Sequence, residues 1–113
     1  MKELKSMSCT RPTRGGPSLS TSEIDQYLPQ VPDWEIVENE GMKRLVCQFK
    51  FDNFVEALEF TNRIGELAEQ EDHHPSILTE WGRVTLIWWT HAVEGLHLND
   101  FISAAKSDQL YVS

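Results

Sequence analysis

The sequence predicts an α+β domain with a four-stranded antiparallel sheet and helices packed on one face, in the order α-β-β-α-β-β-α. Two pairs of strand-like segments, each joined by a short turn, predict two hairpins. A long amphipathic segment separates the pairs, and shorter helical segments lie at both ends. Two hairpins separated by a helix can build one antiparallel sheet with its helices on a single face.

The chain begins with a polar segment and a short helix. Residues 1–19 are rich in Ser, Thr, Gly, Pro and Arg, so we expect a mobile arm ahead of a domain over 20–113. The Gly15-Gly16-Pro17 part of this arm is a candidate to lie on the domain. Ser20 and Glu23 have the spacing of a capping box, which predicts a helix that starts there and ends near Leu28.

The first hairpin is predicted over 34–37 and 43–51, with Asn39-Glu40-Gly41 as the turn. Alternation gives the second strand one apolar face. This face carries Leu45, Cys47, Phe49 and Phe51. The hairpin should therefore bury one side.

The longest helix is predicted over 53–70, with Asp52 as a plausible N-cap. Apolar residues recur there at three- and four-residue steps, which gives the helix one apolar face. They are Phe54, Ala57, Leu58, Ile64, Leu67 and Ala68.

The second hairpin is predicted over 76–81 and 84–91, with Gly82-Arg83 as its turn. Both faces of its second strand are largely apolar, so both are candidates for burial. Gly95-Leu96 interrupts the pattern, and a last helix is predicted over 98–107.

The composition limits the function classes. With 113 residues the chain fits one domain, and its net charge of −8 argues against general affinity for nucleic acids or anionic membranes. The two cysteines, Cys9 and Cys47, do not suggest a disulfide framework, so we expect a reducing, cytoplasmic location. No apolar run approaches the roughly 20 residues that span a bilayer.

Three of the four histidines are candidates for chemistry. His73 and His74 directly precede Pro75, which favours an extended backbone at His74 and should end the long helix. His91 follows the most strand-like run. A helix end and a strand end can lie side by side, so the three imidazoles can converge at the entrance of one pocket. Imidazole titrates near neutral pH, so acid–base catalysis and metal ligation are its usual uses.

Other interpretations of these histidines compete with a catalytic role. A His-His pair in a loop is more often solvated than functional, and His97 is expected to be a surface residue. A zinc site would need converging ligands, but adjacent side chains in an extended segment point to opposite sides. No nucleophile elbow or glycine-rich phosphate loop is present. We therefore do not expect a metal site.

Several spaced motifs together resemble the pterin-4a-carbinolamine dehydratase family over roughly residues 20–107. These are Asp72-His73-His74-Pro75, Trp81, Val84-Thr85, Thr90-His91, Gly95-Leu96 and Asp100. The resemblance implies a lyase that dehydrates 4a-hydroxytetrahydropterin to quinonoid dihydropterin in tetrahydrobiopterin recycling. It also implies a pterin substrate, no cofactor and a homo-oligomer, either a dimer or a tetramer.

The resemblance also assigns residues to roles. It implies that His73, His74 and His91 are catalytic, without saying which is the acid and which is the base. The residues that it places around the pterin are Glu69, Asp72, Trp89, Thr90 and Ala92.

Four positions depart from the family pattern. Ala92 stands where an acid is usual, Trp81 replaces a common tyrosine, and Trp88-Trp89 is bulkier than the usual pair. His97 stands where Ser or Thr usually caps the last helix, which puts that cap in question. Some family members act as dimerisation cofactors for a transcription factor. A non-catalytic pterin-binding or protein-interaction module is therefore the alternative function.

Overall fold

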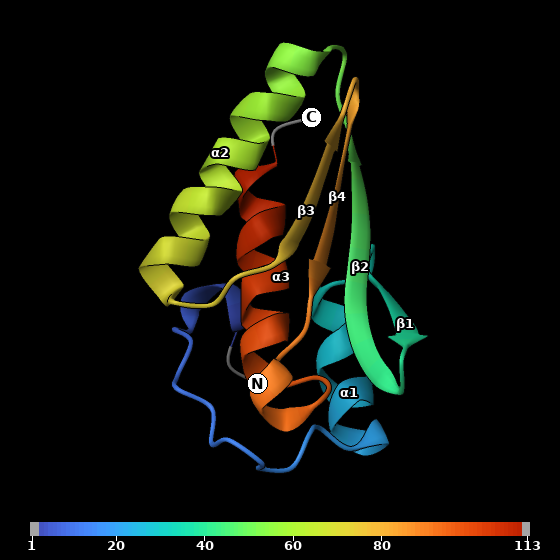
Figure 1. Cartoon of the computed structure of the whole chain (residues 1–113), viewed down its shortest axis with the longest axis vertical. Helices are drawn as coiled ribbons and strands as arrows, with labels where there is room; N and C mark the ends of the chain where they lie inside the picture. The colour runs from blue at the N-terminus through green and yellow to red at the C-terminus, as the bar shows by residue number, and fades with distance from the viewer. Residues whose placement is uncertain (1–2, 112–113) are drawn as a thin grey trace.

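Four antiparallel strands form one sheet, in the order β1-β2-β4-β3, in the computed structural model, which describes residues 3–111. The strands are β1 (Glu35–Asn39), β2 (Met42–Lys50), β3 (Ser76–Glu80) and β4 (Arg83–Trp88). The helices are α1 (Thr21–Tyr27), α2 (Phe54–Glu71) and α3 (Leu98–Leu110), with short 3-10 helices η1 (Leu4–Ser6), η2 (Leu28–Gln30) and η3 (His91–Val93). Figure 1 shows α2 and α3 together on one face of the sheet. The predicted fold class is confirmed.

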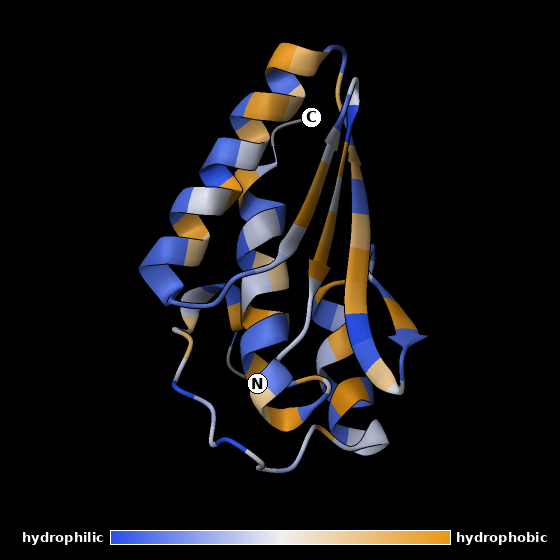
Figure 2. Cartoon of the chain, in the orientation of Figure 1, coloured by the Kyte–Doolittle hydropathy of each residue, from blue (hydrophilic) through white to orange (hydrophobic). Residues whose placement is uncertain are grey.

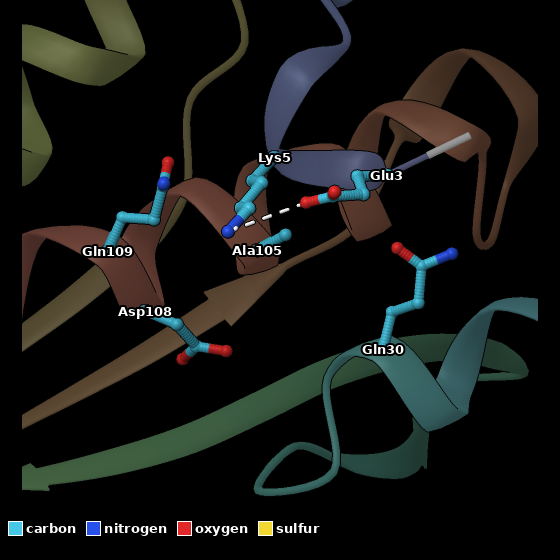
Figure 3. A pocket seen from close by; sticks show the side chains of 6 residues that line it. All are labelled: Glu3, Lys5, Gln30, Ala105, Asp108 and Gln109. Atoms are coloured by element: carbon cyan, nitrogen blue, oxygen red, sulfur yellow. Dashed lines mark ion pairs between the residues drawn. The ribbon is translucent and has the colours of Figure 1, made fainter. Parts of the chain in front are cut away.

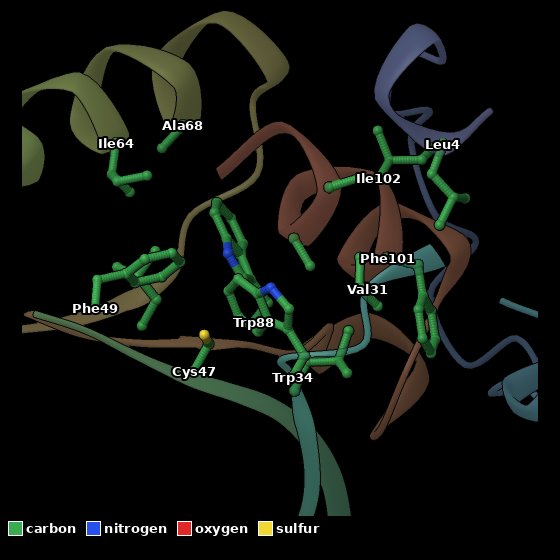
Figure 4. Packing of buried hydrophobic residues seen from close by; sticks show 14 of the residues in the cluster. Leu4, Val31, Trp34, Cys47, Phe49, Ile64, Ala68, Trp88, Phe101 and Ile102 are labelled. Carbon is green, nitrogen blue, oxygen red and sulfur yellow. The ribbon is translucent and has the colours of Figure 1, made fainter. Parts of the chain in front are cut away.

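The central pair, β2 and β4, joins the two hairpins and supplies much of the core. In their register Leu45 lies opposite Trp88, and Phe49 lies opposite Val84. Alternate residues share a face, so these four side chains point together toward the helices, and all are buried. Figure 2 shows apolar residues running along β2 and β4, and Figure 4 shows Trp88 packed among core side chains from several elements.

The helix starts follow local capping chemistry. Ser20 and Glu23 form the predicted capping box of α1. The N-cap of α2 is Asn53 and not Asp52, because the Asn53 backbone is extended and its Oδ1 accepts from the Glu56 N–H at 2.9 Å. The sequence prediction of Asp52 was therefore one residue too early.

Strand β4 ends at Trp88, earlier than the predicted 84–91. Thr90 and Gly95 instead exchange backbone hydrogen bonds across a tight loop, at 2.9 and 3.3 Å. The left-handed conformation of Glu94, with φ of 52°, closes this loop. His91 consequently starts the turn η3 and does not end the strand.

The N-terminal arm, for which mobility was expected over 1–19, contacts the domain at several of its described residues. Leu4 in η1 is fully buried in the core, and its N–H donates to Gln30 Oε1 at 2.9 Å. Figure 1 shows the arm, in dark blue, running past the start of α3 to α1. Figure 3 shows η1 beside α3, where Glu3 and Lys5 pair at the rim of a hollow of about 390 Å³.

The middle of the arm is held by polar contacts to α2 and α3. Cys9 N–H donates to Glu71 at 2.7 Å, while Thr10 and Asn99 exchange two hydrogen bonds at 2.9 and 2.6 Å. Burial opposes the charge of Glu71, but the Cys9 N–H and Lys106 outweigh it and lower the pKa of that carboxyl. Burial raises the pKa of the Cys9 thiol to about 11, so Cys9 packs here as a neutral thiol.

None of the helices within residues 3–111 combines the length and the apolar character needed to cross a membrane.

Candidate active site

The two adjacent histidines diverge because of how α2 ends. Asp72 adopts the left-handed conformation, with φ of 50°, and the N–H groups of Asp72 and His73 both turn back to the Ala68 carbonyl. Pro75 follows, and the chain runs on into β3. His73 turns inward to α3 and β4, whereas His74 turns outward to Glu69, as the predicted alternation requires.

His73 is held on two sides. Its Nε2–H donates to Asp100 Oδ1 at 2.6 Å, and its ring stacks on the Trp88 indole with centroids 5.3 Å apart and planes at 22°. The His73 side chain is only 11% exposed. Both the direction and the plane of this imidazole are therefore fixed.

The fully buried side chain of Asp100 accepts all the hydrogen bonds of a buried network that joins it to His73, Thr90 and the His97 backbone. Its second oxygen, Oδ2, accepts from Thr90 Oγ1 at 2.8 Å and from the His97 backbone N–H at 2.9 Å. A buried carboxylate is costly unless it is paired and hydrogen-bonded, and three donors meet that requirement here. The carboxylate therefore ties the end of α2, the end of β4 and the start of α3 together.

His74 has a different setting. Its Nε2 pairs with Glu69 Oε2 across the last turn of α2, and the two side chains are 57% and 77% exposed. Such a pair is screened by water and contributes little to stability. It nevertheless orients an imidazole that solvent and a ligand can reach.

His91 lies one residue beyond Thr90 and contacts a neighbour on its own segment. The Trp89 Nε1–H donates to His91 Nε2 at 3.0 Å, and the two rings meet edge to face at 5.2 Å. Trp88 and Trp89 are adjacent in extended chain, so they point to opposite faces of the sheet. His73 and His91 therefore each contact a tryptophan on a different face.

A cavity of about 460 Å³ lies beside His91, within the size range of small-molecule sites. It is lined by Arg14, Gly15, His91, Ala92 and Glu94. The arm reaches it because Gly15 N–H donates to the Ala92 carbonyl at 2.7 Å, and Gly15 takes the left-handed φ of 77° that this turn needs.

The residues named from the sequence thus fall into three settings. Thr90 is buried and bonds to Asp100 in the same network as His73, and Glu69 pairs with His74. Trp89 and Ala92 accompany His91, while Asp72 is the exposed left-handed residue that ends α2. The cavity beside His91 is not lined by His73 or His74.

Two residues that lie at these positions, Asp100 and Arg14, were not predicted from the sequence to have a role. Asp100 was noted only as a motif position, although its spacing from His97 is that of a capping box. Arg14 lies in the arm, and only the glycine turn after it hinted that the arm could rest on the domain. Among residues 3–111, no group of three His, Cys, Asp or Glu side chains is arranged to hold a metal ion.

His97 corrects a further expectation. It is partly buried, and it caps α3, because its Nδ1 accepts from the Asn99 N–H at 3.0 Å. The imidazole thus takes the role that a Ser or Thr oxygen would have. Burial lowers the pKa of His97, and nearby His73 adds to that effect against the opposing charge of Asp100.

The lowered pKa of His97 predicts a pH-dependent stability. Between the ordinary value of 6.5 and the lower folded value, the unfolded chain binds more protons, so the free energy of unfolding falls as the pH falls. This contribution is complete above 6.5 and is lost as the pH drops through the folded value. His97→Ser keeps a capping oxygen but does not titrate, so its stability should decline less between about pH 8 and pH 5.

Urea unfolding of both proteins across this range measures the difference in free energy. Parallel curves for the wild type and His97→Ser would contradict the assignment.

The comparisons with known proteins agree with one another. Residues 17–110 match the family model described as pterin 4 alpha carbinolamine dehydratase. A protein of Nitrosococcus oceani is 54% identical over 97% of both chains, and one of Chlorobium limicola is 54% identical over 98% of both. Both bear the provisional name of a pterin-4-alpha-carbinolamine dehydratase. A crystal structure titled transcriptional coactivator/pterin dehydratase, from Brucella melitensis, superposes with a TM-score of 0.75 at 29% identity, covering 82% of this chain and 97% of that one.

Proposed function

This chain belongs to the pterin 4 alpha carbinolamine dehydratase family, and on that premise we propose that it dehydrates a 4a-hydroxytetrahydropterin to the quinonoid dihydropterin. The observation that carries the proposal is the ligand-sized cavity beside His91. The other two candidate imidazoles, His73 and His74, are each held by a carboxylate. The product would serve tetrahydrobiopterin recycling in the cytoplasm.

The reaction needs one proton donor and one proton acceptor. The bond between C4a and the hydroxyl oxygen breaks, and the oxygen gains a proton and leaves as water. A ring nitrogen loses its proton, and the electron pair that this frees forms the new carbon–nitrogen double bond. Groups that titrate near the working pH perform such transfers best, and imidazoles meet this condition.

We assign these steps to His73, His74 and His91, with no metal or cofactor. The Asp100 carboxylate holds the ring of His73, and Glu69 holds that of His74, so each imidazole keeps a defined direction. His91 lines the cavity with Ala92, while the Trp89 Nε1–H donates a hydrogen bond to His91. Thr90 and Asp72 are also assigned to binding of the pterin. Thr90 lies in the buried network, and Asp72 lies at the surface where α2 ends.

An interaction role is the second candidate. The Brucella melitensis structure carries coactivator in its title, and the present chain exposes large apolar side chains at one end of the molecule. They are Phe54, Val55 and Leu58 at the start of α2, and Leu78 and Trp81 on the β3 hairpin. This apolar surface supports a protein partner, and turnover of the pterin distinguishes the two roles.

The histidine mechanism predicts a strong loss of turnover on truncation. His73→Ala and His91→Ala should each lower kcat by on the order of 10²–10⁴, because each removes an imidazole that the proposed mechanism uses. The measurement is dehydration of a chemically generated 4a-hydroxytetrahydropterin, with the spontaneous rate subtracted. Wild-type kcat in either variant, or activity lost to EDTA and restored by zinc, would exclude this mechanism.

We also propose that the chain forms a homo-oligomer, a dimer or a tetramer built as a dimer of dimers. Val55 and Trp81 are 64% and 73% exposed, and β3 is an edge strand, so this end of the domain leaves apolar area and backbone groups to be covered. Sedimentation at micromolar concentration should give a mass above one chain. A mass of one chain would contradict the proposal.

A further inference from the structure

The hydrogen bond between Trp89 and His91 limits what His91 can do. An indole nitrogen can only donate, so His91 Nε2 must be the acceptor and cannot carry a proton while the bond lasts. In this arrangement the imidazole is neutral and its single proton lies on Nδ1. No described residue of 3–111 makes a hydrogen bond to Nδ1, and His91 lines the cavity. The Nδ1–H is therefore available to a ligand.

The indole that sets this tautomer is itself held in place. The Arg44 guanidinium carbon lies 4.2 Å from the centre of the Trp89 ring, in cation–π contact across the β2–β4 pair. Arg44 Nε is buried and has no hydrogen-bond partner among the described residues, so this ring contact orients the guanidinium. Ala92 offers no polar side-chain atom, which leaves Trp89 as the side chain that orients His91.

From this geometry we infer that Trp89 is a positioning residue that holds His91 as the Nδ1–H tautomer, so that His91 donates a hydrogen bond to an oxygen of the bound substrate. The inference rests on the proposed dehydratase function and refines it. The lone pair of His91 that could accept a proton is occupied by Trp89. His91 then holds the substrate oxygen and stabilises charge that develops on it.

The cavity lining fits a ligand that presents oxygen acceptors on this side. Among the other lining residues, Arg14 of the arm adds a second donor and Glu94 adds an acceptor. A hydroxylated pterin has a ring carbonyl and the departing hydroxyl, and both accept hydrogen bonds. The inference concerns the hydrogen bond from His91 to such an oxygen.

The tautomer can be read directly from the free protein. In ¹⁵N-labelled wild type, long-range ¹H–¹⁵N correlation spectra should show the His91 proton on Nδ1. Trp89→Phe keeps a ring under Arg44 but removes the donor, so His91 should shift toward the Nε2–H form. Trp81→Phe is the matched control, because Trp81 is 73% exposed on the β3–β4 turn, and it should leave the His91 signals unchanged.

The functional readout compares two replacements of His91. The amide nitrogen of Asn overlays Nδ1 of His, so His91→Asn keeps a donor in place but cannot act as a base. His91→Ala should lower kcat by on the order of 10²–10³, as for loss of one donor to a developing oxyanion, and His91→Asn should recover part of that loss.

The outcomes separate this inference from the proposed function. An Nε2–H tautomer in the wild type, or an unchanged tautomer in Trp89→Phe, overturns the role of Trp89. Equal kcat in His91→Asn and His91→Ala, with an active wild type, overturns the donor role and leaves the dehydratase function standing. A wild type without turnover refutes the proposed function, while the spectra still decide the tautomer.

Discussion

The buried carboxylate of Asp100 is the constraint on which the candidate site depends. It accepts hydrogen bonds from His73, from Thr90 and from the backbone of His97, and so it joins the end of α2, the end of β4 and the start of α3. His73 lies 27 residues from Asp100 in the sequence, whereas Thr90 and His97 lie 10 and 3 residues from it. Losing any one donor would leave buried charge less well paired, which makes the three positions interdependent.

This network determines where the imidazoles can point. His73 is committed to Asp100 and to the face of Trp88, so its neighbour His74 must turn outward. The bond from Thr90 to Asp100 holds the segment on which Trp89 and His91 sit, at the opposite face of the sheet. The arm completes the arrangement by placing Arg14 beside His91. The site is therefore built from three supported imidazoles and not from one cluster.

The fold and part of the site could be predicted from sequence because their causes are local. Alternation and helical spacing predicted the two hairpins and α2. Pro75 and the alternation of side chains in an extended segment predicted that His73 and His74 diverge. The early end of β4 was missed because it depends on the pairing of Thr90 with Gly95.

The contacts that were missed join distant parts of the chain. Thr10 pairs with Asn99, and Gly15 with Ala92, and no periodicity within the arm encodes such partners. The cap at His97 was missed for a chemical reason, because an imidazole nitrogen can replace the oxygen of a usual cap.

The most direct test of this account is the dehydration rate of a 4a-hydroxytetrahydropterin with wild type and with Asp100→Asn, each checked for folding by circular dichroism. Asn keeps the shape of Asp but carries no charge and offers one acceptor oxygen, so the variant should lose about 1–3 kcal/mol of stability and still fold. The account predicts a wild-type rate well above the spontaneous one and a markedly lower kcat in folded Asp100→Asn. A wild-type rate equal to the spontaneous one, or equal kcat in both proteins, would contradict it.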